Sequence, residues 1–216
     1  LILDPNYSTT LAFVRNSADG DRDFVFYRSS QTSEDLNLRY GEVNRQLIDS
    51  CRIFHFGSLS LTDETSRTAT VNAVEYAKMQ EKIVTYDPNW RPHLWENKES
   101  AIRTMRSAAQ YADIVKVSEL ELQLLSDSGA LIPGVAKLLQ MGVKIICVTQ
   151  GAKGCIIATP KGINRFPAYK TKTVDTLGSG DGFFGAFLYK FLETGKSIEE
   201  LDSDDIKELA MFSNAC

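Results

Sequence analysis

The chain lacks the long apolar runs and the excess of basic residues that mark membrane proteins and nucleic-acid-binding proteins. No run reaches the roughly 18 apolar residues that a transmembrane helix needs. Across 216 residues, 24 Lys and Arg stand against 28 Asp and Glu, for a net charge of -4. No charged and apolar leader of the secretory kind opens the sequence. We therefore expect no membrane segment, no nucleic-acid partner and a cytoplasmic location.

Histidine and cysteine are also scarce. The sequence contains these six, without a CxxC pair: His55, His93, Cys51, Cys147, Cys155 and Cys216. So few possible ligands, without a CxxC pair, argue against a zinc site. Cys147 and Cys155 lie in strand-like segments, so we expect buried free thiols rather than disulfides. His55 alternates with apolar neighbours in RIFHFGS and is predicted to be a hydrogen-bonded strand residue rather than a catalytic one.

What the sequence does contain is a regular alternation of strand-like and helix-like segments. Two β-type runs at 10–15 and 24–28 flank Asp19-Gly20 and predict a hairpin. Beyond it, strands are expected at 52–58, 82–87, 113–118 and 144–151, and a second hairpin at 154–168. Helical periodicity covers 42–49, 64–80, 99–112, 119–126, 133–141, 181–194 and 204–216. The alternation predicts an α/β fold with a mostly parallel sheet covered by helices on both faces.

Polar or glycine-rich sequence follows four of these strands, where a plain connection would need only a turn. The segments are TYDPNWRPHLW (85–95), VKVSELE (115–121), CVTQGAKG (147–154) and TVDTLGSGD (173–181). In an open parallel sheet, ligands bind beyond the carboxyl ends of the strands. The four segments together therefore predict a ligand site at this edge of the sheet.

The stretch GSGDGFF opens a predicted helix at about Gly180. Backbone amides at a helix start attract anions, and glycines at 178 and 180 allow a phosphate to approach closely. A glycine turn capped by Ser179 or Asp181 is the competing explanation. The carboxylate of Asp181 favours a phosphate site over a simple cap, because a carboxylate beside an anion site is unfavourable unless it has a role there. In phosphoryl transfer, Asp181 would accept the proton of the attacking hydroxyl.

The other three segments are individually weaker. VKVSELE places Ser118 and Glu121 one turn apart, which predicts a capping box and also suits a polar pair facing phosphates or hydrated Mg²⁺. CVTQGAKG is not a Walker loop and by itself indicates a β-turn. In DPNWRPHLW, Trp90 and Trp95 are explained by packing, whereas Asp87, Asn89 and Arg91 are unusual together on one exposed strand end.

Taken in this order, the four segments resemble the PfkB/ribokinase family of carbohydrate kinases, most closely its fructokinase branch. VDTLGSGDGFFGAF is similar to the family's DTxGAGD signature, with Ser179 where alanine is usual, and VTQGAKG is similar to its VTxGxxG strand. VKVSELE stands at the family's NxxE motif, with Ser118 in place of asparagine, and TYDPNWRPHLW resembles the fructokinase stretch DPNxRxxLW. The resemblance covers the whole chain.

The resemblance implies a ribokinase-like three-layer αβα sandwich with a small β lid. Residues 1–35 would form part of the lid and 36–216 the nucleotide- and sugar-binding core. The family's N-terminal strand with its GG-N motif and its C-terminal tail are not matched, so we expect residues 1–216 by themselves to have little kinase activity. A homodimer through the lid is a further expectation at the level of the family.

The resemblance also implies ATP as phosphoryl donor, Mg²⁺, and often a stimulating K⁺. Asp181 would be the general base, beside an anion hole of the Gly178, Ser179 and Gly180 amides. Arg28, Asn89, Arg91 and Asp175 would bind the sugar or phosphates, and Asp175 also a monovalent cation. The expected nucleotide-site residues are Ser118, Glu121 (toward Mg²⁺ through water), Thr149, Gly151, Gly154 and Asn214.

Two alternatives to a fructokinase stay open at this point. A 2-keto-3-deoxygluconate kinase shares the DPN and YR features, and Arg28 and Arg91 would suit its carboxylate substrate. A kinase-like protein that binds a sugar or partner without catalysis is favoured slightly by Ser118 and disfavoured by the intact GSGD.

Overall fold

The computed structural model describes residues 4–16, 22–29, 31–172 and 175–216. The strands are β1 (Leu11–Asn16), β2 (Arg22–Tyr27), β3 (Ile53–Gly57), β4 (Ile83–Asp87), β5 (Ile114–Ser118), β6 (Ile145–Thr149), β7 (Cys155–Thr159) and β8 (Gly162–Phe166). The α-helices are α1 (Arg45–Ser50), α2 (Glu64–Met79), α3 (Lys98–Ala109), α4 (Glu119–Ser126), α5 (Leu131–Gln140), α6 (Ser179–Thr194) and α7 (Ser203–Ala215).

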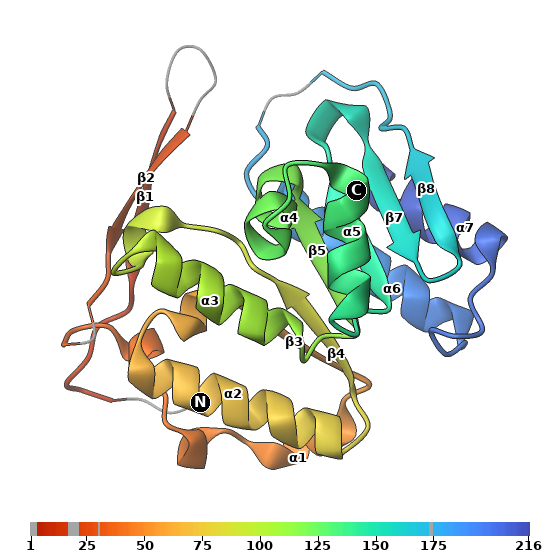
Figure 1. Ribbon diagram of the computed structural model, residues 1–216. Coiled ribbons are helices and arrows are strands. Elements are labelled where there is room, and N and C mark those ends of the chain that lie inside the picture. Colours follow the sequence, from red (N-terminus) through yellow and green to blue (C-terminus); the bar gives the residue numbers. More distant parts are fainter. Residues whose placement is uncertain (1–3, 17–21, 30, 173–174) are drawn as a thin grey trace.

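Six of these strands form one sheet in the order β3-β4-β5-β6-β7-β8. Neighbours from β3 to β6 pair in parallel, whereas β7 and β8 are antiparallel additions. β1 and β2 pair antiparallel in a sheet of their own, which stands apart from the larger sheet (Figure 1). The mostly parallel sheet and both hairpins confirm the predictions. The turn expected at Asp19-Gly20 lies outside the described residues.

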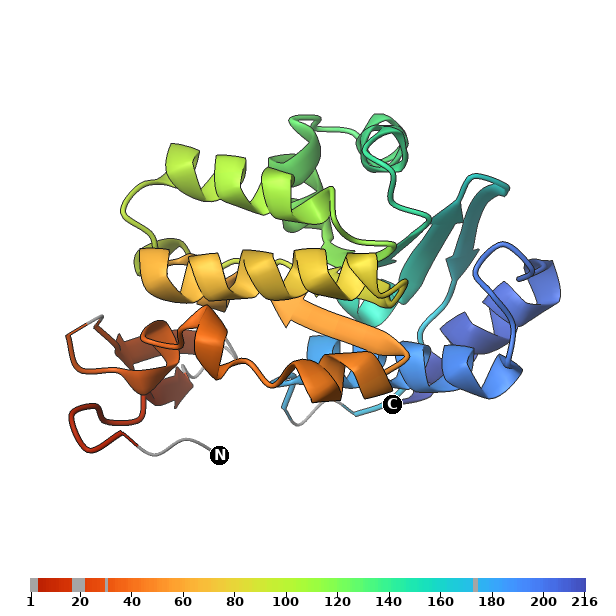
Figure 2. The same cartoon turned by 90° about the horizontal axis from the view of Figure 1, so that it is seen from below.

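Alternating side chains of the central strands feed two separate hydrophobic cores. In β6, Ile146 and Val148 join a core that also receives side chains from α2, α3, α4 and α5. Ile145 and Cys147 point to the opposite face and join a core built with α6 and α7. Figures 1 and 2 show these two helical layers on either side of the sheet. The three-layer αβα sandwich is therefore confirmed, and it follows from strands that are apolar on both faces.

Side chains that accept backbone N–H groups fix where several helices begin. Asp63 accepts from Thr65 N before α2, and Asn97 accepts from Ser100 N before α3. α1 differs from the helix predicted at 42–49: it begins at Arg45, because Asn44 is its N-cap and accepts from Gln46 N. The segment before it, Tyr40–Glu42, is a 3-10 turn instead.

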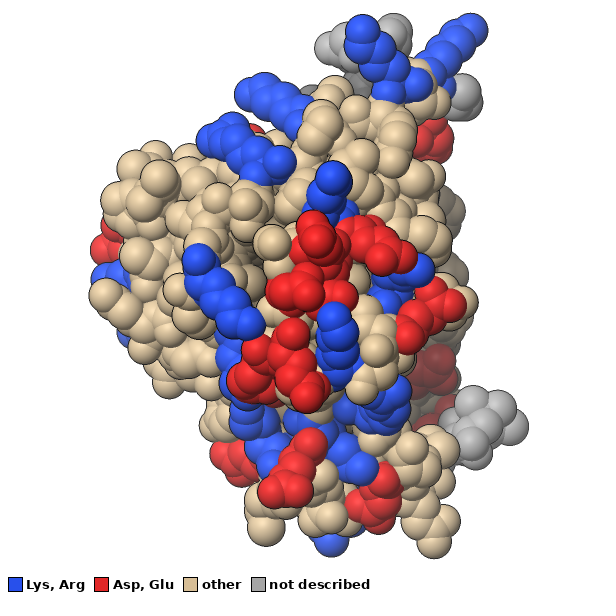
Figure 3. All heavy atoms as spheres, turned by 90° about the vertical axis from the view of Figure 1, so that its right-hand side faces the viewer, with Lys and Arg blue, Asp and Glu red and all other residues tan. Residues whose placement is uncertain are grey.

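Charges of both signs are mixed on the face that carries β8 and α7 (Figure 3). Ion pairs between α6, the segment after it and α7 include Lys196 with Asp205 at 2.6 Å and Lys190 with Glu208 at 2.8 Å. Exposed pairs of this kind contribute little to stability. In the part of the chain that the structure describes, no helix combines the length and the apolar character that spanning a membrane requires.

Candidate active site at the carboxyl edge of the sheet

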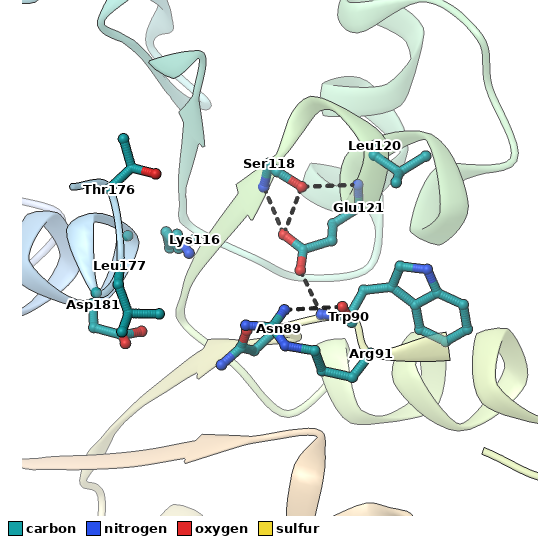
Figure 4. Close-up of a pocket in the computed structure, with 12 residues that line it drawn as sticks. Asn89, Trp90, Arg91, Lys116, Ser118, Leu120, Glu121, Thr176, Leu177 and Asp181 are labelled. Atoms are coloured by element: carbon teal, nitrogen blue, oxygen red, sulfur yellow. Dashed lines mark hydrogen bonds between the residues drawn. The ribbon is translucent and has the colours of Figure 1, made fainter. Parts of the chain in front are cut away.

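A cavity of about 370 Å³ lies where the chain leaves β4 and β5 and where α6 begins. Figure 4 shows Thr176, Leu177 and Asp181 on one side of it, Asn89, Trp90 and Arg91 on the other, and Lys116 between them. The lining residues are Asn89, Trp90, Arg91, Lys116, Ser118, Leu120, Glu121, Thr176, Leu177, Gly178, Gly180 and Asp181. Its place at the carboxyl ends of parallel strands is the one expected for a ligand site.

The first turn of α6 forms one wall. Gly178 is the N-cap with a φ of +74° and provides no side-chain cap for the following amides. The helical ladder starts with Gly182 N donating to Gly178 O at 2.7 Å, and Ser179 N donates back to Thr176 O at 3.1 Å. Asp181, in the first turn, is exposed and lines the cavity. The wall therefore presents a helix N-terminus, which attracts anions, with one carboxylate beside it.

A buried ion pair forms the floor. Lys116 Nζ donates to Asp87 Oδ2 at 2.8 Å, and the two side chains are 10% and 7% exposed. A Cβ on Gly180 would lie 2.7 Å from the same Nζ, so the ammonium sits against the first turn of α6. Burial raises the pKa of Asp87, and the charge of Lys116 opposes that shift. The floor thus places an ammonium group, paired with the Asp87 carboxylate, beside the helix N-terminus.

Glu121 holds the opposite wall together. Its Oε2 accepts from Ser118 N at 2.7 Å and from Ser118 Oγ at 2.8 Å, while Ser118 Oγ accepts from Glu121 N at 3.3 Å. This is the predicted capping box at the start of α4. Glu121 Oε1 also accepts from Trp90 N at 2.7 Å, a contact that spans 31 residues. The carboxylate therefore ties the loop after β4 to the end of β5.

That loop carries Asn89 and Arg91 into the cavity. Asn89 has a φ of +47°, a left-handed conformation that asparagine tolerates better than most residues. Its backbone N–H donates to Asp87 Oδ1 at 3.2 Å. Arg91 Nη1 donates to Trp90 O at 3.0 Å. The loop thus presents an amide and a guanidinium group opposite Asp181 (Figure 4).

Arg28, predicted to reach the substrate or phosphates, is not among the residues that line this cavity. Its side chain is 5% exposed and pairs with Asp35 Oδ2 at 2.8 Å. Arg28 Nη1 donates to Thr62 Oγ1 at 2.7 Å, and Nη2 donates to Leu59 O at 2.8 Å. These contacts fasten the base of the β1–β2 hairpin to the segment after β3, and the substrate role of Arg28 stays a prediction.

Four of the residues expected at the nucleotide also lie outside the cavity. Thr149 Oγ1 donates to Val117 O at 3.4 Å, and Gly151 opens a 3-10 turn with a φ of +56°. Gly154 has a φ of +94°, and a Cβ there would collide with the Phe166 carbonyl. Asn214 Nδ2 donates to that carbonyl at 3.3 Å and to Pro167 O at 3.2 Å. Gly154 and Asn214 therefore both lie against the backbone of Phe166 and Pro167. The nucleotide role of all four residues stays a prediction.

Ser179 and Asp175 stand next to the cavity without lining it. Asp175 is exposed, and its Oδ1 accepts from Leu177 N at 2.6 Å, which shapes the turn before α6. Conversely, the cavity contains residues that sequence reasoning missed or assigned to packing: Trp90, Lys116, Leu120, Thr176 and Leu177. Lys116 alternates with valines in VKVS and gave no sign of its partner, Asp87, which is 29 residues away.

The cavity suits a phosphate ester better than a metal bound by the protein alone. Among the described residues, no group of three or more His, Cys, Asp or Glu side chains could hold a metal ion. Glu121 already accepts three hydrogen bonds, of about four that a carboxylate offers. The remaining acceptor position of Glu121 suits a hydrogen bond from a water ligand of hydrated Mg²⁺. The other ligands of that ion would be water and phosphate oxygens.

His55 lies on β3, the outer strand of the described part of the sheet. Its Nδ1 is 3.0 Å from Thr85 Oγ1, which confirms the prediction of a hydrogen-bonded strand histidine. His55 is exposed on its strand, and its partial desolvation by neighbouring groups lowers the pKa of the imidazole, while the negative charge of Asp181 acts in the opposite direction.

Comparison with known proteins identifies the family of the chain. A family described as pfkB family carbohydrate kinase matches residues 1–216. Probable fructokinase-5 of Arabidopsis thaliana is 42% identical over 99% of this chain and 65% of its own length. Fructokinase-1 of Oryza sativa subsp. japonica is 39% identical over 100% of this chain and 66% of its own. The chain thus spans about two thirds of these curated relatives.

Solved structures give the same result. A fructokinase from Xylella fastidiosa with bound ATP superposes with a TM-score of 0.87 at 29% identity, covering 98% of this chain and 67% of that one. A fructokinase double mutant from Vibrio cholerae O395, in a form with fructose, ADP and potassium bound, gives 0.85 at 28%, covering 99% and 66%. Because the family match spans all of the chain and the fold agrees, the chain belongs to the pfkB family of carbohydrate kinases.

Proposed function

We propose that the protein is an ATP-dependent phosphotransferase that transfers the γ-phosphoryl group to the 6-hydroxyl of D-fructose. One observation carries the proposal: the same cavity sets Asp181 and the start of α6 opposite Asn89 and Arg91, with Lys116 between them (Figure 4). Groups suited to a phosphate and groups suited to a polyol thus face one another. Phosphoryl transfer needs this arrangement, because it depends mainly on positioning and on charge stabilisation.

In the proposed reaction, Asp181 accepts the proton of the sugar hydroxyl as that oxygen attacks the phosphorus. The amides of Gly178, Ser179 and Gly180 face the charge on the transferring group, although Ser179 N is already shared with Thr176 O. Lys116 adds its ammonium from the floor. Asn89 and Arg91 hold the sugar from the opposite wall.

Cofactors follow from the same cavity. Mg²⁺, when bound, neutralises charge on the phosphates, and Glu121 and Ser118 would orient its water from the start of α4. We keep Asp175, beside the turn into α6, as the candidate carboxylate for a monovalent cation such as K⁺. Thr149, Gly151, Gly154 and Asn214 are proposed to line the nucleotide beyond the described cavity. Arg28 is proposed to support the substrate site from the base of the lid, through its contacts with Asp35, Thr62 and Leu59.

The choice of fructose over a keto acid rests on the guanidinium groups. Among the described residues, Arg91 is the one arginine that lines the cavity, whereas Arg28 is engaged by Asp35, Thr62 and Leu59. A carboxylate substrate gains from each guanidinium group that reaches it in bidentate fashion. The relatives named fructokinase point the same way.

We further propose that the protein acts in the cytoplasm and that the β1–β2 hairpin mediates a homodimer. The hairpin exposes bulky apolar side chains: Leu11, Phe13, Val14, Val25 and Tyr27. Such a patch on an extended ribbon is typical of an interaction surface.

The test is a radiolabelled-ATP assay of the full-length protein with fructose, other neutral ketoses and 2-keto-3-deoxygluconate. We expect the largest kcat/KM for fructose. A larger value for the keto acid would replace the fructokinase assignment, and binding of sugar without label transfer would favour a protein without catalysis.

A further inference from the structure

The ion pair between Asp87 and Lys116 stands out among the charged groups of the molecule. Both residues are buried, and their charged atoms are 2.8 Å apart at the cavity floor. In the part of the chain that the structure describes, Lys116 is the one buried lysine. Burying such a charge is costly unless a partner neutralises it. Asp87 supplies that partner.

The pair has a fixed orientation. Asp87 Oδ2 accepts from Lys116, and Asp87 Oδ1 accepts from Asn89 N at 3.2 Å, so both carboxylate oxygens are engaged. On the other side, Gly180 admits the lysine: a Cβ there would lie 2.7 Å from Nζ and 3.3 Å from Cε. The ammonium is therefore held between a carboxylate and the first turn of α6. An ammonium has three donors, and one of them is directed to Asp87.

We propose that Asp87 is a positioning residue that acts through Lys116, holding its ammonium where the charge on the transferring phosphoryl group develops. This inference rests on the phosphoryl transfer proposed above. Asp87 lies behind the lysine and is not among the residues that line the cavity. Its effect on the reaction thus passes through the position of Lys116.

The opposing explanation is that the pair only stabilises the fold. The two explanations differ in what happens when Asp87 loses its charge but keeps its shape. In the positioning account, Asp87→Asn releases the ammonium from its carboxylate, so a nucleotide phosphate binds more tightly while the aligned geometry for transfer is lost. In the structural account, thermal stability falls and the folded enzyme turns over normally.

A double-mutant cycle in the full-length protein separates them. Asp87→Asn, Lys116→Met and the double variant are compared for kcat with fructose and for ADP affinity by calorimetry. We expect Asp87→Asn to lower kcat by about tenfold or more and to tighten ADP binding about threefold, and both effects to vanish when Lys116→Met is also present. The double variant leaves no unpaired charge buried. If Lys116→Met alone does not fold, the double variant is compared directly with the wild type, and it must lack the tighter ADP binding of Asp87→Asn.

Asp113 provides the matched control. It is also a buried aspartate paired with lysines, Lys78 and Lys144, each at 3.5 Å, but it precedes β5 at the opposite end of the sheet. Asp113→Asn should lower the thermal midpoint and leave kcat and ADP affinity unchanged.

The inference is overturned if Asp87→Asn leaves kcat within about twofold of the wild type, or if its effect is equal in the wild-type and the Lys116→Met backgrounds. If the wild type phosphorylates no sugar, the proposed function fails separately. The ADP affinities of the wild type, the two single variants and the double variant then still test the role of Asp87. Asp87→Asn must tighten ADP binding when Lys116 is present and must not do so when Lys116 is replaced.

Discussion

At the scale of single residues, Gly178 and Gly180 are close in sequence but are required for different physical reasons. Gly178 has a φ of +74°, and among the described residues no atom outside its own neighbouring backbone lies within 4 Å of the position a Cβ would take. A Cβ on Gly180, in contrast, would meet Lys116 Nζ. Gly178→Ala should therefore cost about 1–2 kcal/mol of stability through backbone strain and change ADP affinity little. Gly180→Ala should displace the ammonium and lower kcat with a smaller loss of stability. Urea unfolding and steady-state kinetics of both variants check this, and equal profiles would contradict it.

Ser118 shows how a departure from a family pattern is accommodated. Its hydroxyl accepts from Glu121 N and donates to Glu121 Oε2, and an asparagine offers both an acceptor and a donor. We expect Ser118→Asn to keep stability and to alter the Mg²⁺ dependence more than the sugar KM. Ser118→Ala should cost about 1 kcal/mol through the lost N-cap. A strong shift of the sugar KM with unchanged Mg²⁺ dependence would place residue 118 away from the phosphates.

At the scale of elements, Glu121 couples the start of α4 to the loop after β4. Its carboxylate accepts from Ser118 N, Ser118 Oγ and Trp90 N. Glu121→Gln would turn an N–H₂ group toward one of these donors, so we expect a loss of about 1–3 kcal/mol and a raised sugar KM, because the loop carries Asn89 and Arg91. Chemical unfolding and fructose kinetics measure the two effects. Glu119→Gln, at the exposed start of the same helix, is the control: it keeps an acceptor for Gln150 Nε2 and should cost at most about 1 kcal/mol, with an unchanged sugar KM.

These contacts also show which parts of the site were predictable. The capping box of Ser118 and Glu121 is readable because its members are three residues apart, and the glycine turn before Asp181 has a local signature. The contacts of Glu121 with Trp90 and of Lys116 with Asp87 join residues 31 and 29 apart. They depend on the register of parallel strands, which local pattern does not specify.

The same distinction holds for the fold. The alternation of strands and helices predicted the parallel sheet, because βαβ units constrain connection and handedness. The start of α1 was predicted three residues too early, at 42 instead of Arg45. The N-cap at Asn44 and the preceding 3-10 turn depend on particular hydrogen bonds that helical periodicity does not show. For Arg28, the resemblance implied a contact with substrate or phosphates, which stays a prediction. Its contacts with Thr62 and Leu59, 34 and 31 residues away, could not be read from the sequence.

At the scale of the whole molecule, the thiols report on the core between the sheet and α6. Cys147 and Cys155 are buried and free, as predicted, and Cys216 is exposed. Burial raises the pKa of Cys155 to about 11, so its reactive thiolate is scarce at neutral pH. We expect thiol reagents to leave both residues unmodified in the native protein and to label them only on global unfolding. Mass spectrometry of labelled peptides across a urea series checks this, and early labelling would mean that this core opens locally.

The central claim, that the cavity transfers a phosphoryl group with Asp181 as base, is tested most directly by kcat of Asp181→Asn in the full-length protein. Asparagine keeps the size and the helix start while removing the base. We predict that kcat falls about 10²- to 10⁴-fold, the usual range for a positioned base, with the thermal midpoint and ATP affinity nearly unchanged. If kcat stays at the wild-type value while the midpoint drops, Asp181 is a helix cap and the account of this site is wrong.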